Sequence, residues 1–442
     1  MIYYIDPENG KSENSGICIS SPLLSVENRI FEPGDKVLFK RGTVIRSELN
    51  LAGGNETGSI TYGAYGEGAN PVVNPSVRAD LPAQWKEASP GIWYFTDTVP
   101  SEMCNIVFND GESFGNLRWS KKDLKHTGEW TCEQLGYSMN HEKPENKDGR
   151  VYLVCNMNPA EYYRSIELVV WGKRQAVTVQ QYALIENLTF EKCGVHGFSA
   201  TKAQNVYIRN CTFRCIGGGV FDRRQKIRLG NAVEFWNGAV DCTVEDCLFE
   251  DIYDSGVTHQ GNAQSELPER LVFRRNTFRR CGLAAYEWRG PLSRDIVFED
   301  NVCEEAGGAF TMQGEASPRR TETLEPICAC AFVLIWLKNQ DLPDGQICCT
   351  IRNNKFNAVS GCEAIIVSTL ENSAYHQFVI DHNQYIGADR KPLAYIRGKK
   401  YYFRDFEAYQ ADTDKDQNSD FSTVDQNAIC CADKLLYAGN AN

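Results

Sequence analysis

The sequence predicts an all-β fold in which the chain winds as a parallel β-solenoid. Seven short stretches share one pattern, with a polar residue three positions before an aromatic or sulfur-containing residue. They read NLTF (187–190), NCTF (210–213), DCLF (246–249), RNTF (275–278), DNVC (300–303), NNKF (353–356) and HNQY (382–385). The last residues of the first five lie 23, 36, 29 and 25 residues apart. A period in the middle twenties, with short β-branched strands and no helical pattern, indicates stacked coils, because one coil alone buries little surface.

The residues within the repeat have expected places in such a coil. Recurring Asn, Asp and Cys suit tight turns and interior stacks, where identical side chains satisfy one another along the axis. The 36-residue interval contains GGGVFDRRQKIRLG (217–230), which we interpret as a loop inserted beside the rung that carries Glu234. Long loops on one face of a solenoid commonly shape its binding surface. The 53-residue interval after Cys303 accommodates two coils, with CAFVLIWL (330–337) as a strand of the unmarked coil.

Composition limits the class of partner. The 442 residues carry 58 acidic and 46 basic side chains, and the net charge of -12 argues against a nucleic-acid partner. No apolar run approaches the length of a membrane span, so we expect no membrane partner. Most of the 18 cysteines lie in strand-like segments, where reduced Cys packs as a small hydrophobe. The spacing at 328–330 and at Cys348 and Cys349 lacks a paired CxxC, so no metal–thiolate site is expected.

The N-terminus and the cysteines bear on location. The opening MIYYIDPENG has no charged segment leading into an apolar stretch, and reduced cysteines are typical of the cytoplasm. We therefore expect a cytoplasmic protein, or a secreted one if a leader was removed from the sequence given.

Before residue 175 the repeat fades into strands broken by Pro-Gly and Gly turns. The stretches YYIDPENG, EPGDKVLFKRGTVIRSELNL and GSITYGAYGEGANPVV lie here. Together with the repeat, this series resembles the right-handed parallel β-helix proteins of the pectate-lyase-like superfamily. Members of one bacterial branch of that superfamily often begin with such a series. The resemblance implies a single-stranded right-handed parallel β-helix. It leaves the reaction open, because that superfamily includes lyases, glycoside hydrolases, epimerases, esterases and noncatalytic adhesins.

The same resemblance implies an organisation in four parts. Residues 1–83 would form the N-terminal coils, and 84–170, with Trp85, WYF and LRWSKKDLK, would be an inserted β-rich segment. Residues 171–405 would form the main β-helix. The tail from 406 to 442, with FEAYQADTDKDQNSDF, is similar to the closing segment of these proteins.

Two glutamates are the leading catalytic candidates. In GNAVEFWNGA (230–239), Val233 and Phe235 favour the interior and leave Glu234 pointing outward, since a charge inside the solenoid would be unpaired. Aligning the Cys-Gly pairs at 193–194 and 281–282 places Glu287 of AAYEWRG over Ser199. Two rungs would separate the glutamates by about 10 Å at the backbone. Asp254 is a reserve carboxylate, although it could equally cap its turn.

The alignment leaves one position open between these acids. Either Thr258 or His259 occupies the intervening rung, and a slip of one residue would send the side chain to the opposite face. His259 is a candidate for proton transfer or for binding a sugar hydroxyl. Aromatic rings beside the acids suit sugar stacking, although Tyr286 could simply be core, and an arginine could hold a carboxylate. The residues expected to contact substrate are His196, Trp236, Gln260, Trp288, Arg289 and Arg224.

Three functions fit this pattern. The preferred one is a glycoside hydrolase that cleaves a polysaccharide or oligosaccharide, with Glu287 and Glu234 as the acid and base pair and no cofactor. The separation of the pair favours inversion. The second is a polysaccharide lyase, in which a Lys, Arg or His base abstracts a proton from a uronic acid and calcium or a basic group neutralises the carboxylate. The third is a noncatalytic carbohydrate-binding module. The oligomeric state stays open.

Overall fold

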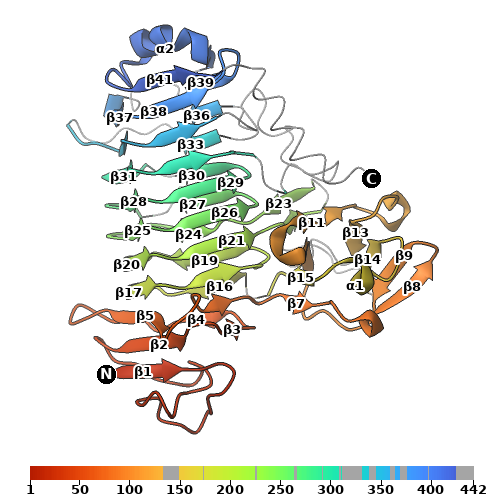
Figure 1. Ribbon diagram of the computed structural model, residues 1–442. Helices are drawn as coiled ribbons and strands as arrows, with labels where there is room; N and C mark the ends of the chain where they lie inside the picture. The colour runs from red at the N-terminus through yellow and green to blue at the C-terminus, as the bar shows by residue number, and fades with distance from the viewer. Residues whose placement is uncertain are drawn as a thin grey trace.

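The computed structural model describes residues 1–132, 149–172, 174–223, 226–262, 266–290, 292–307, 310, 331–337, 345–358, 364–368, 376–396 and 398–424. They form a right-handed parallel β-helix, which confirms the predicted fold (Figure 1). Successive coils stack from the N-terminal to the C-terminal end, and each coil contributes a strand to three long sheets. No helix within the described ranges is long and apolar enough to cross a membrane.

Each of the three long sheets has ten strands. We number the sheets in the order in which the chain passes through them within one coil. Sheet 1 contains β1 (Ile2–Ile5), β2 (Lys36–Lys40), β5 (Ile60–Tyr65), β17 (Gln181–Glu186), β20 (Gln204–Arg209), β25 (Thr243–Glu245), β28 (Val272–Arg274), β31 (Ile296–Glu299), β34 (Cys349–Arg352) and β37 (Phe378–Asp381). Sheet 2 contains β3 (Val44–Ile45), β6 (Val72–Val73), β18 (Thr189–Glu191), β21 (Thr212–Ile216), β26 (Leu248–Ile252), β29 (Thr277–Cys281), β32 (Val302–Glu304), β35 (Lys355–Asn357), β38 (Gln384–Gly387) and β41 (Asp420–Thr423). Sheet 3 contains β4 (Leu49–Asn50), β16 (Gln175–Thr178), β19 (His196–Thr201), β24 (Val233–Trp236), β27 (Ser255–Gln260), β30 (Ala284–Gly290), β33 (Ala331–Leu337), β36 (Ala364–Ser368), β39 (Pro392–Ile396) and β40 (Lys399–Tyr402).

Each position of the sequence repeat has its own structural role. The last residue packs in an interior aromatic stack, in which the rings of Phe213 and Phe249 lie 5.3 Å apart. The second residue forms a buried polar ladder, in which the Asn301 side chain donates to Asn354 Oδ1 at 3.0 Å and the Asn354 side chain to Asn383 Oδ1 at 3.1 Å. The first residue has a positive φ at the turn between sheets 1 and 2, as in Asn187, Asn210, Asp246, Arg275, Asp300, Asn353 and His382. The predicted turns and interior stacks are therefore confirmed.

The 53-residue interval after Cys303 is one coil and not two, so that prediction was wrong. β32 pairs directly with β35, with Val302 opposite Lys355. The apolar stretch at 330–337 supplies β33, which is the sheet 3 strand of this same coil and pairs directly with β30. The chain from β32 to β35 therefore makes a single coil. The prediction failed because the length of an interval alone does not distinguish a second coil from longer loops.

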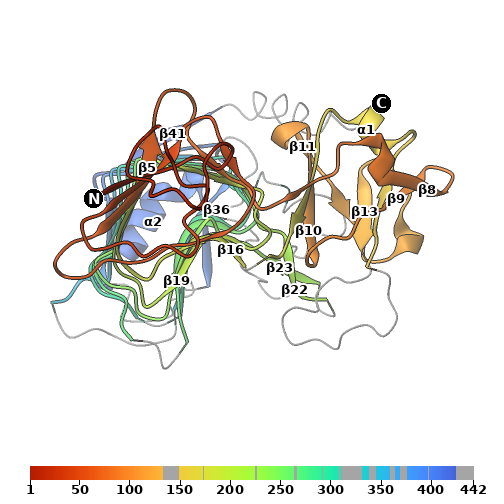
Figure 2. The ribbon, with the colours of Figure 1, turned by 90° about the horizontal axis from the view of Figure 1, so that it is seen from below.

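The insertion forms two small sheets beside the solenoid (Figures 1 and 2). One contains β7 (Val77–Arg78), β10 (Met103–Phe108), β11 (Ser113–Phe114) and β15 (Ile166–Val170), and the other contains β8 (Trp85–Ser89), β9 (Ile92–Phe95), β12 (Asn116–Leu117), β13 (Glu129–Cys132) and β14 (Val151–Val154). A short helix, α1 (Pro159–Tyr162), and 3₁₀ turns at Pro82–Gln84, Asn109–Gly111 and Lys121–Asp123 complete it. The expected loop at 217–230 forms a hairpin of β22 (Gly219–Asp222) and β23 (Ile227–Leu229). Val220 of this hairpin packs into the core of the insertion.

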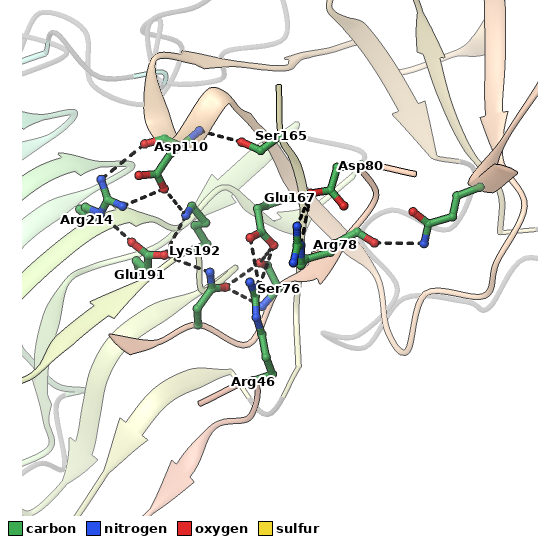
Figure 3. Close-up of polar contacts among 12 residues, drawn as sticks. Arg46, Ser76, Arg78, Asp80, Asp110, Ser165, Glu167, Glu191, Lys192 and Arg214 are labelled. Carbon is green, nitrogen blue, oxygen red and sulfur yellow. Dashed lines mark hydrogen bonds and ion pairs between the residues drawn. The ribbon is translucent and has the colours of Figure 1, made fainter. Parts of the chain in front are cut away.

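Buried charges fix the insertion to the solenoid (Figure 3). Lys192, which directly follows β18, is 3% exposed, and its Nζ lies 2.7 Å from both Glu191 Oε1 and Asp110 Oδ1 of the insertion. Arg214 binds the same two carboxylates, at 2.6 Å from Glu191 and 2.8 Å from Asp110. The two cations and two anions balance in charge; Lys192 and Glu191 are buried, whereas Asp110 of the insertion is 65% exposed. The insertion is thus held in one position relative to sheet 2.

The C-terminal end of the solenoid is covered by α2 (Phe406–Thr413), which follows a 3₁₀ turn at Phe403–Asp405 (Figure 1). The polar ladder ends at Asp416, whose carboxylate accepts hydrogen bonds from Asn383, Tyr385 and Tyr409 at 2.8–3.2 Å. Every cysteine that the structure describes is free of a disulfide, and all but Cys18 are buried, as the sequence predicts for reduced core residues.

Candidate functional site

The outward faces of sheets 1 and 2 carry charges that alternate in sign from rung to rung. On sheet 1, Arg209 binds Glu186 at 2.6 Å, and Arg274 binds Glu245 at 2.8 Å. The paired column there reads Glu186, Arg209, Glu245, Arg274, Glu299, Arg352 and Asp381. On sheet 2 it reads Glu191, Arg214, Glu250, Arg279 and Glu304. Opposite charges on neighbouring strands stabilise a sheet, so these columns have a structural explanation.

Sheet 3 departs from this alternation. Its outward column, which we call the acid column, contains Asn50, Thr178, Ser199, Glu234, Thr258, Glu287 and Leu334. Over these rungs the acid column holds two carboxylates and no base. Glu234 is 5% exposed and Glu287 is 1% exposed, whereas the ladder acids lie nearer the solvent, except Glu191, which is also 5% exposed and is paired with Arg214. Neither acid joins a ladder of alternating charge: Glu234 has no basic neighbour in the acid column, and Glu287 is paired only along its own strand, with Arg289.

Glu234 is held by neutral hydrogen-bond donors. The Asn231 side-chain amide donates to Glu234 Oε2 at 2.8 Å, and the Ser199 hydroxyl donates to Oε1 at 3.3 Å. His196 Nε2 faces Oε1 at 3.5 Å. The carboxylate is therefore oriented from three sides, two of which come from the preceding rung.

His196 faces Glu234 as a neutral imidazole. Its Nδ1 accepts the backbone N–H of Asn231 at 3.2 Å, so the ring proton lies on Nε2, on the side of Glu234. Burial lowers the pKa of His196, and this effect outweighs the opposing effect of Glu234. The imidazole can thus donate a hydrogen bond to the carboxylate without carrying a charge.

Glu287 has a different environment, because a cation binds it. Arg289 Nη2 lies 2.8 Å from Glu287 Oε1. The Ser255 hydroxyl donates to Oε2 at 2.9 Å, and the Gln260 amide approaches it at 3.3 Å. The Arg289 guanidinium also lies over the Trp336 ring, 5.1 Å from its centre. Glu287 is therefore ion-paired, whereas Glu234 is bound by neutral groups.

Asn231 and Ser255 connect the two glutamates. While its amide nitrogen binds Glu234, the Asn231 side-chain oxygen accepts the backbone N–H of Ser255 at 3.1 Å. The hydroxyl of Ser255 in turn donates to Glu287. A continuous path of hydrogen bonds therefore runs from one acid to the other, and both linking residues are buried. Sequence reasoning missed Asn231, Ser255 and Trp336, although a polar residue three positions before Glu234 was a signal.

Both carboxylates lean in the same direction along the axis. Glu234 accepts a hydrogen bond from Ser199 and faces His196 on the preceding strand, and Glu287 accepts from Ser255 and Gln260 on the strand that precedes its own. Because both side chains lean the same way, the distance between the two carboxylates stays close to the distance between their backbones. Two rungs correspond to about 10 Å.

His259 and Trp288 do not face the acids, and their prediction as a catalytic and a binding residue was wrong. Both lie in the inward column with Phe235, and they are 1% and 0% exposed. Their rings pack 4.9 Å apart in the solenoid core. Burial lowers the pKa of His259 to about 3. Thr258 occupies the rung between the glutamates, because side chains alternate between the faces of a strand. Tyr286 is also in the core.

The remaining predicted residues have separate places. Asp254 is buried, and its Oδ2 accepts the backbone N–H of Gly230 at 2.9 Å, which ties the end of the hairpin to the next rung. This contact favours its role in the turn over a role as second carboxylate. Trp236, Gln260 and Arg289 share a second outward column beside the acid column. Arg224 lies outside the described residues.

No group of three or more His, Cys, Asp or Glu side chains is placed to hold a metal ion in the part of the chain that the structure describes.

The hairpin of β22 and β23 carries a buried arginine, Arg228. Arg228 is 4% exposed, donates to the backbone oxygens of Gly218 and Cys104 at 2.8 Å, and lies over the Tyr253 ring at 4.7 Å. Arg228 therefore fastens the hairpin to the insertion beside the acid column.

A comparison of the sequence with models of protein families also indicates a β-helix. A family model described as a right handed beta helix region matches residues 169–322. No curated protein sequence matched this chain.

Solved structures similar to the chain include a GH136 lacto-N-biosidase from Eubacterium ramulus, with 13% identity, coverage of 96% of this chain and 68% of that chain, and a TM-score of 0.41. A protein described as a glycoside hydrolase has 12% identity, coverage of 90% and 88%, and a TM-score of 0.48. A rhamnogalacturonan lyase has 10% identity, coverage of 88% and 76%, and a TM-score of 0.37. At these values the similarities carry no conclusion about the reaction.

Proposed function

We propose that this protein is a glycoside hydrolase that cleaves a polysaccharide or oligosaccharide with Glu234 and Glu287. The observation that carries the proposal is the break in the charge pattern on sheet 3. Sheets 1 and 2 pair each outward acid with a base on the next rung, whereas sheet 3 buries two acids in one column and orients each with several donors. Buried and oriented carboxylates that sheet stability does not require are typical of catalytic sites.

The two environments favour different roles for the acids. Glu287 is the acid that a cation contacts, through Arg289, and we assign it as the base that activates water. No cation contacts Glu234 among the groups that hold it, and we assign it as the acid that protonates the glycosidic oxygen. Inverting hydrolases have carboxylates about 6.5 to 9.5 Å apart and retaining ones about 5 to 5.5 Å apart, so two rungs favour inversion. Water would attack the anomeric carbon as the bond to the leaving oxygen breaks.

The second outward column supplies the groups that would hold the sugar. In register it contains Trp236, Gln260, Arg289 and Trp336. Trp236, Arg289 and Trp336 are partly exposed, so this column connects the buried acids with the surface. The apolar face of a pyranose packs on an aromatic ring, and polar groups between two rings can bind its hydroxyls. Substrate would approach along this column.

A polysaccharide lyase is the second candidate, and Arg289 is the observation that favours it. Its side chain is 43% exposed beside Glu287 and could neutralise the carboxylate of a uronic acid. The position of His259 in the core removes it as the base. His196 is then the histidine nearest the acids.

A panel of neutral and uronic-acid polysaccharides distinguishes the two reactions. Products are followed both as reducing ends and by ultraviolet absorbance, because elimination creates a conjugated double bond and hydrolysis does not. The proposal predicts reducing ends without new absorbance. Absorbance that rises in step with product would establish a lyase, and binding without either signal would indicate a noncatalytic module.

A further inference from the structure

A cavity of about 310 Å³ lies at the N-terminal end of the solenoid, between residues 26–31 and residues 50–52. Its volume lies at the lower end of the range for small-molecule pockets, about 300 to 1,000 Å³. Aromatic and aliphatic side chains form part of the wall, and amide and charged groups form the rest. The lining residues that matter here are Phe31, Leu51, Tyr62, Asn28, Asn50 and Arg29.

The cavity lies on the same column as the catalytic candidates. Asn50 pairs with Thr178, the next strand places Ser199 beside Thr178, and Ser199 pairs with Glu234. Three rungs separate Asn50 from Glu234, which is roughly 14 Å. Asn50 is exposed, and the side chains of Thr178 and Ser199 between them are small and half-buried. Thr178 and Ser199 are therefore the polar side chains of the acid column that lie between Glu234 and Asn50.

The walls of the cavity suit a neutral sugar. Phe31 and Leu51 offer a small apolar surface, at 7% and 6% exposed, whereas Tyr62 is fully buried and its hydroxyl donates to the backbone oxygen of Ala52 at 2.8 Å. Asn28 and Asn50 carry amides that can both donate to and accept from sugar hydroxyls. Glu27 and Arg29 bring opposite charges, and Arg29 donates to backbone oxygens of Ser12 and Asn14 at 2.6 and 2.7 Å. The lining therefore has no excess charge to attract an ionic ligand.

We propose that this cavity is a remote subsite that binds a neutral sugar unit of the same chain whose glycosidic bond lies at Glu234 and Glu287. The substrate then lies along the solenoid axis on sheet 3. The spacing is one that a trisaccharide or tetrasaccharide spans. This inference rests on the proposed function, because it assigns the cavity to the substrate of those acids.

The test measures how affinity depends on chain length. Glu287→Gln, which stops hydrolysis under the proposed mechanism, is titrated by calorimetry with xylose-, glucose- and galactose-based oligosaccharides, from the monosaccharide to the hexasaccharide. Ala52→Trp is added to fill the cavity from an exposed position that lines it. Ala69→Trp is the matched control, since Ala69 is exposed on a turn between sheets 1 and 2.

The inference predicts an increase in affinity between the trisaccharide and the pentasaccharide of one series. Ala52→Trp should remove that increase, a loss of about tenfold or more for the longer chains, and Ala69→Trp should retain it. Equal affinity of the Ala52→Trp and Ala69→Trp variants at every length, or no binding by any series, would overturn the subsite. Length-dependent binding that Ala52→Trp abolishes, in a wild-type protein that cleaves none of these sugars, supports the cavity as a sugar site while the proposed hydrolysis fails.

Discussion

Glu234 and Glu287 project from the same face of sheet 3 two rungs apart, with Thr258 between them. Each carboxylate is bonded towards the preceding rung, so their spacing stays close to the roughly 10 Å between the backbones. Asn231 and Ser255 join them through hydrogen bonds. The alternating ladders of the other two sheets do not share this relationship.

Hydrolysis should invert the anomeric configuration. The spacing leaves room for a water molecule between Glu287 and the sugar, which a retaining enzyme does not need in its first step. Proton NMR of the first product, recorded before mutarotation, shows which anomer is released. Release of the anomer with the configuration of the substrate would contradict the assigned geometry.

Asn231→Ala should slow turnover with little change in KM. The variant loses two hydrogen bonds, one to Glu234 and one from Ser255, worth about 0.5 to 1.5 kcal/mol each, so kcat should fall roughly 10- to 100-fold. Asn231 touches Glu234 and His196 and acts through them as a positioning residue. Steady-state kinetics separates the two parameters, and a rise in KM at constant kcat would show that Asn231 serves substrate binding instead.

Acid should destabilise the protein through His259. The folded state holds the pKa of His259 near 3 because the ring is buried, whereas the unfolded chain titrates near 6.5. Between these values unfolding takes up a proton, so the stability contributed above pH 6.5 is lost as the pH falls, by up to about 1.4 kcal/mol per pH unit. His259→Phe should unfold with a shallower pH dependence over this window in urea titrations. Parallel profiles for the two proteins would show that His259 does not titrate in this way.

Lys192→Met should weaken the attachment of the insertion. The variant loses one of the two cations that bind Glu191, while Arg214 still binds it, so the cost should be below the roughly 3 to 5 kcal/mol of a fully unpaired buried charge but above about 1 kcal/mol. Urea unfolding measures the loss. The control is Lys202→Met, because Lys202 and its partner Glu266 are 56% and 66% exposed and such pairs contribute about 1 kcal/mol or less. Equal effects of the two substitutions would argue against the buried network.

The fold could be predicted because each position of the repeat carries a separate constraint. Asn353 makes the turn, Asn354 joins the ladder and Phe356 joins the aromatic stack, so the pattern NNKF encodes one corner of a coil. The number of coils after Cys303 could not be predicted in the same way. An apolar strand such as β33 fits either a second coil or the same one, and only its pairing with β30 decides between them.

The site was predicted in part. Glu234 was placed by its apolar neighbours, which need the interior, and Glu287 by the Cys-Gly alignment. The alignment left Thr258 and His259 as alternatives for the rung between the acids, because a shift of one residue exchanges the two faces of a strand, and Thr258 takes the outward position. Asn231 and Ser255 reach the acids through side-chain geometry that strand alternation does not encode. The alternation of Glu186, Arg209 and Glu245 was visible in the sequence. Comparison with it would have singled out Glu234 and Glu287 as acids without a base on the neighbouring rungs of their column.

The rate of glycosidic bond cleavage by three glutamine variants tests the central claim most directly. Glu234→Gln and Glu287→Gln should each lower kcat by roughly 10²- to 10⁴-fold, the contribution of general acid–base catalysis, while the protein still folds and binds sugar. Glu299→Gln, which changes an acid of the sheet 1 ladder that is bound to Arg352, should keep the wild-type rate. Wild-type turnover in either Glu234→Gln or Glu287→Gln would contradict the assignment of these two residues as the catalytic pair.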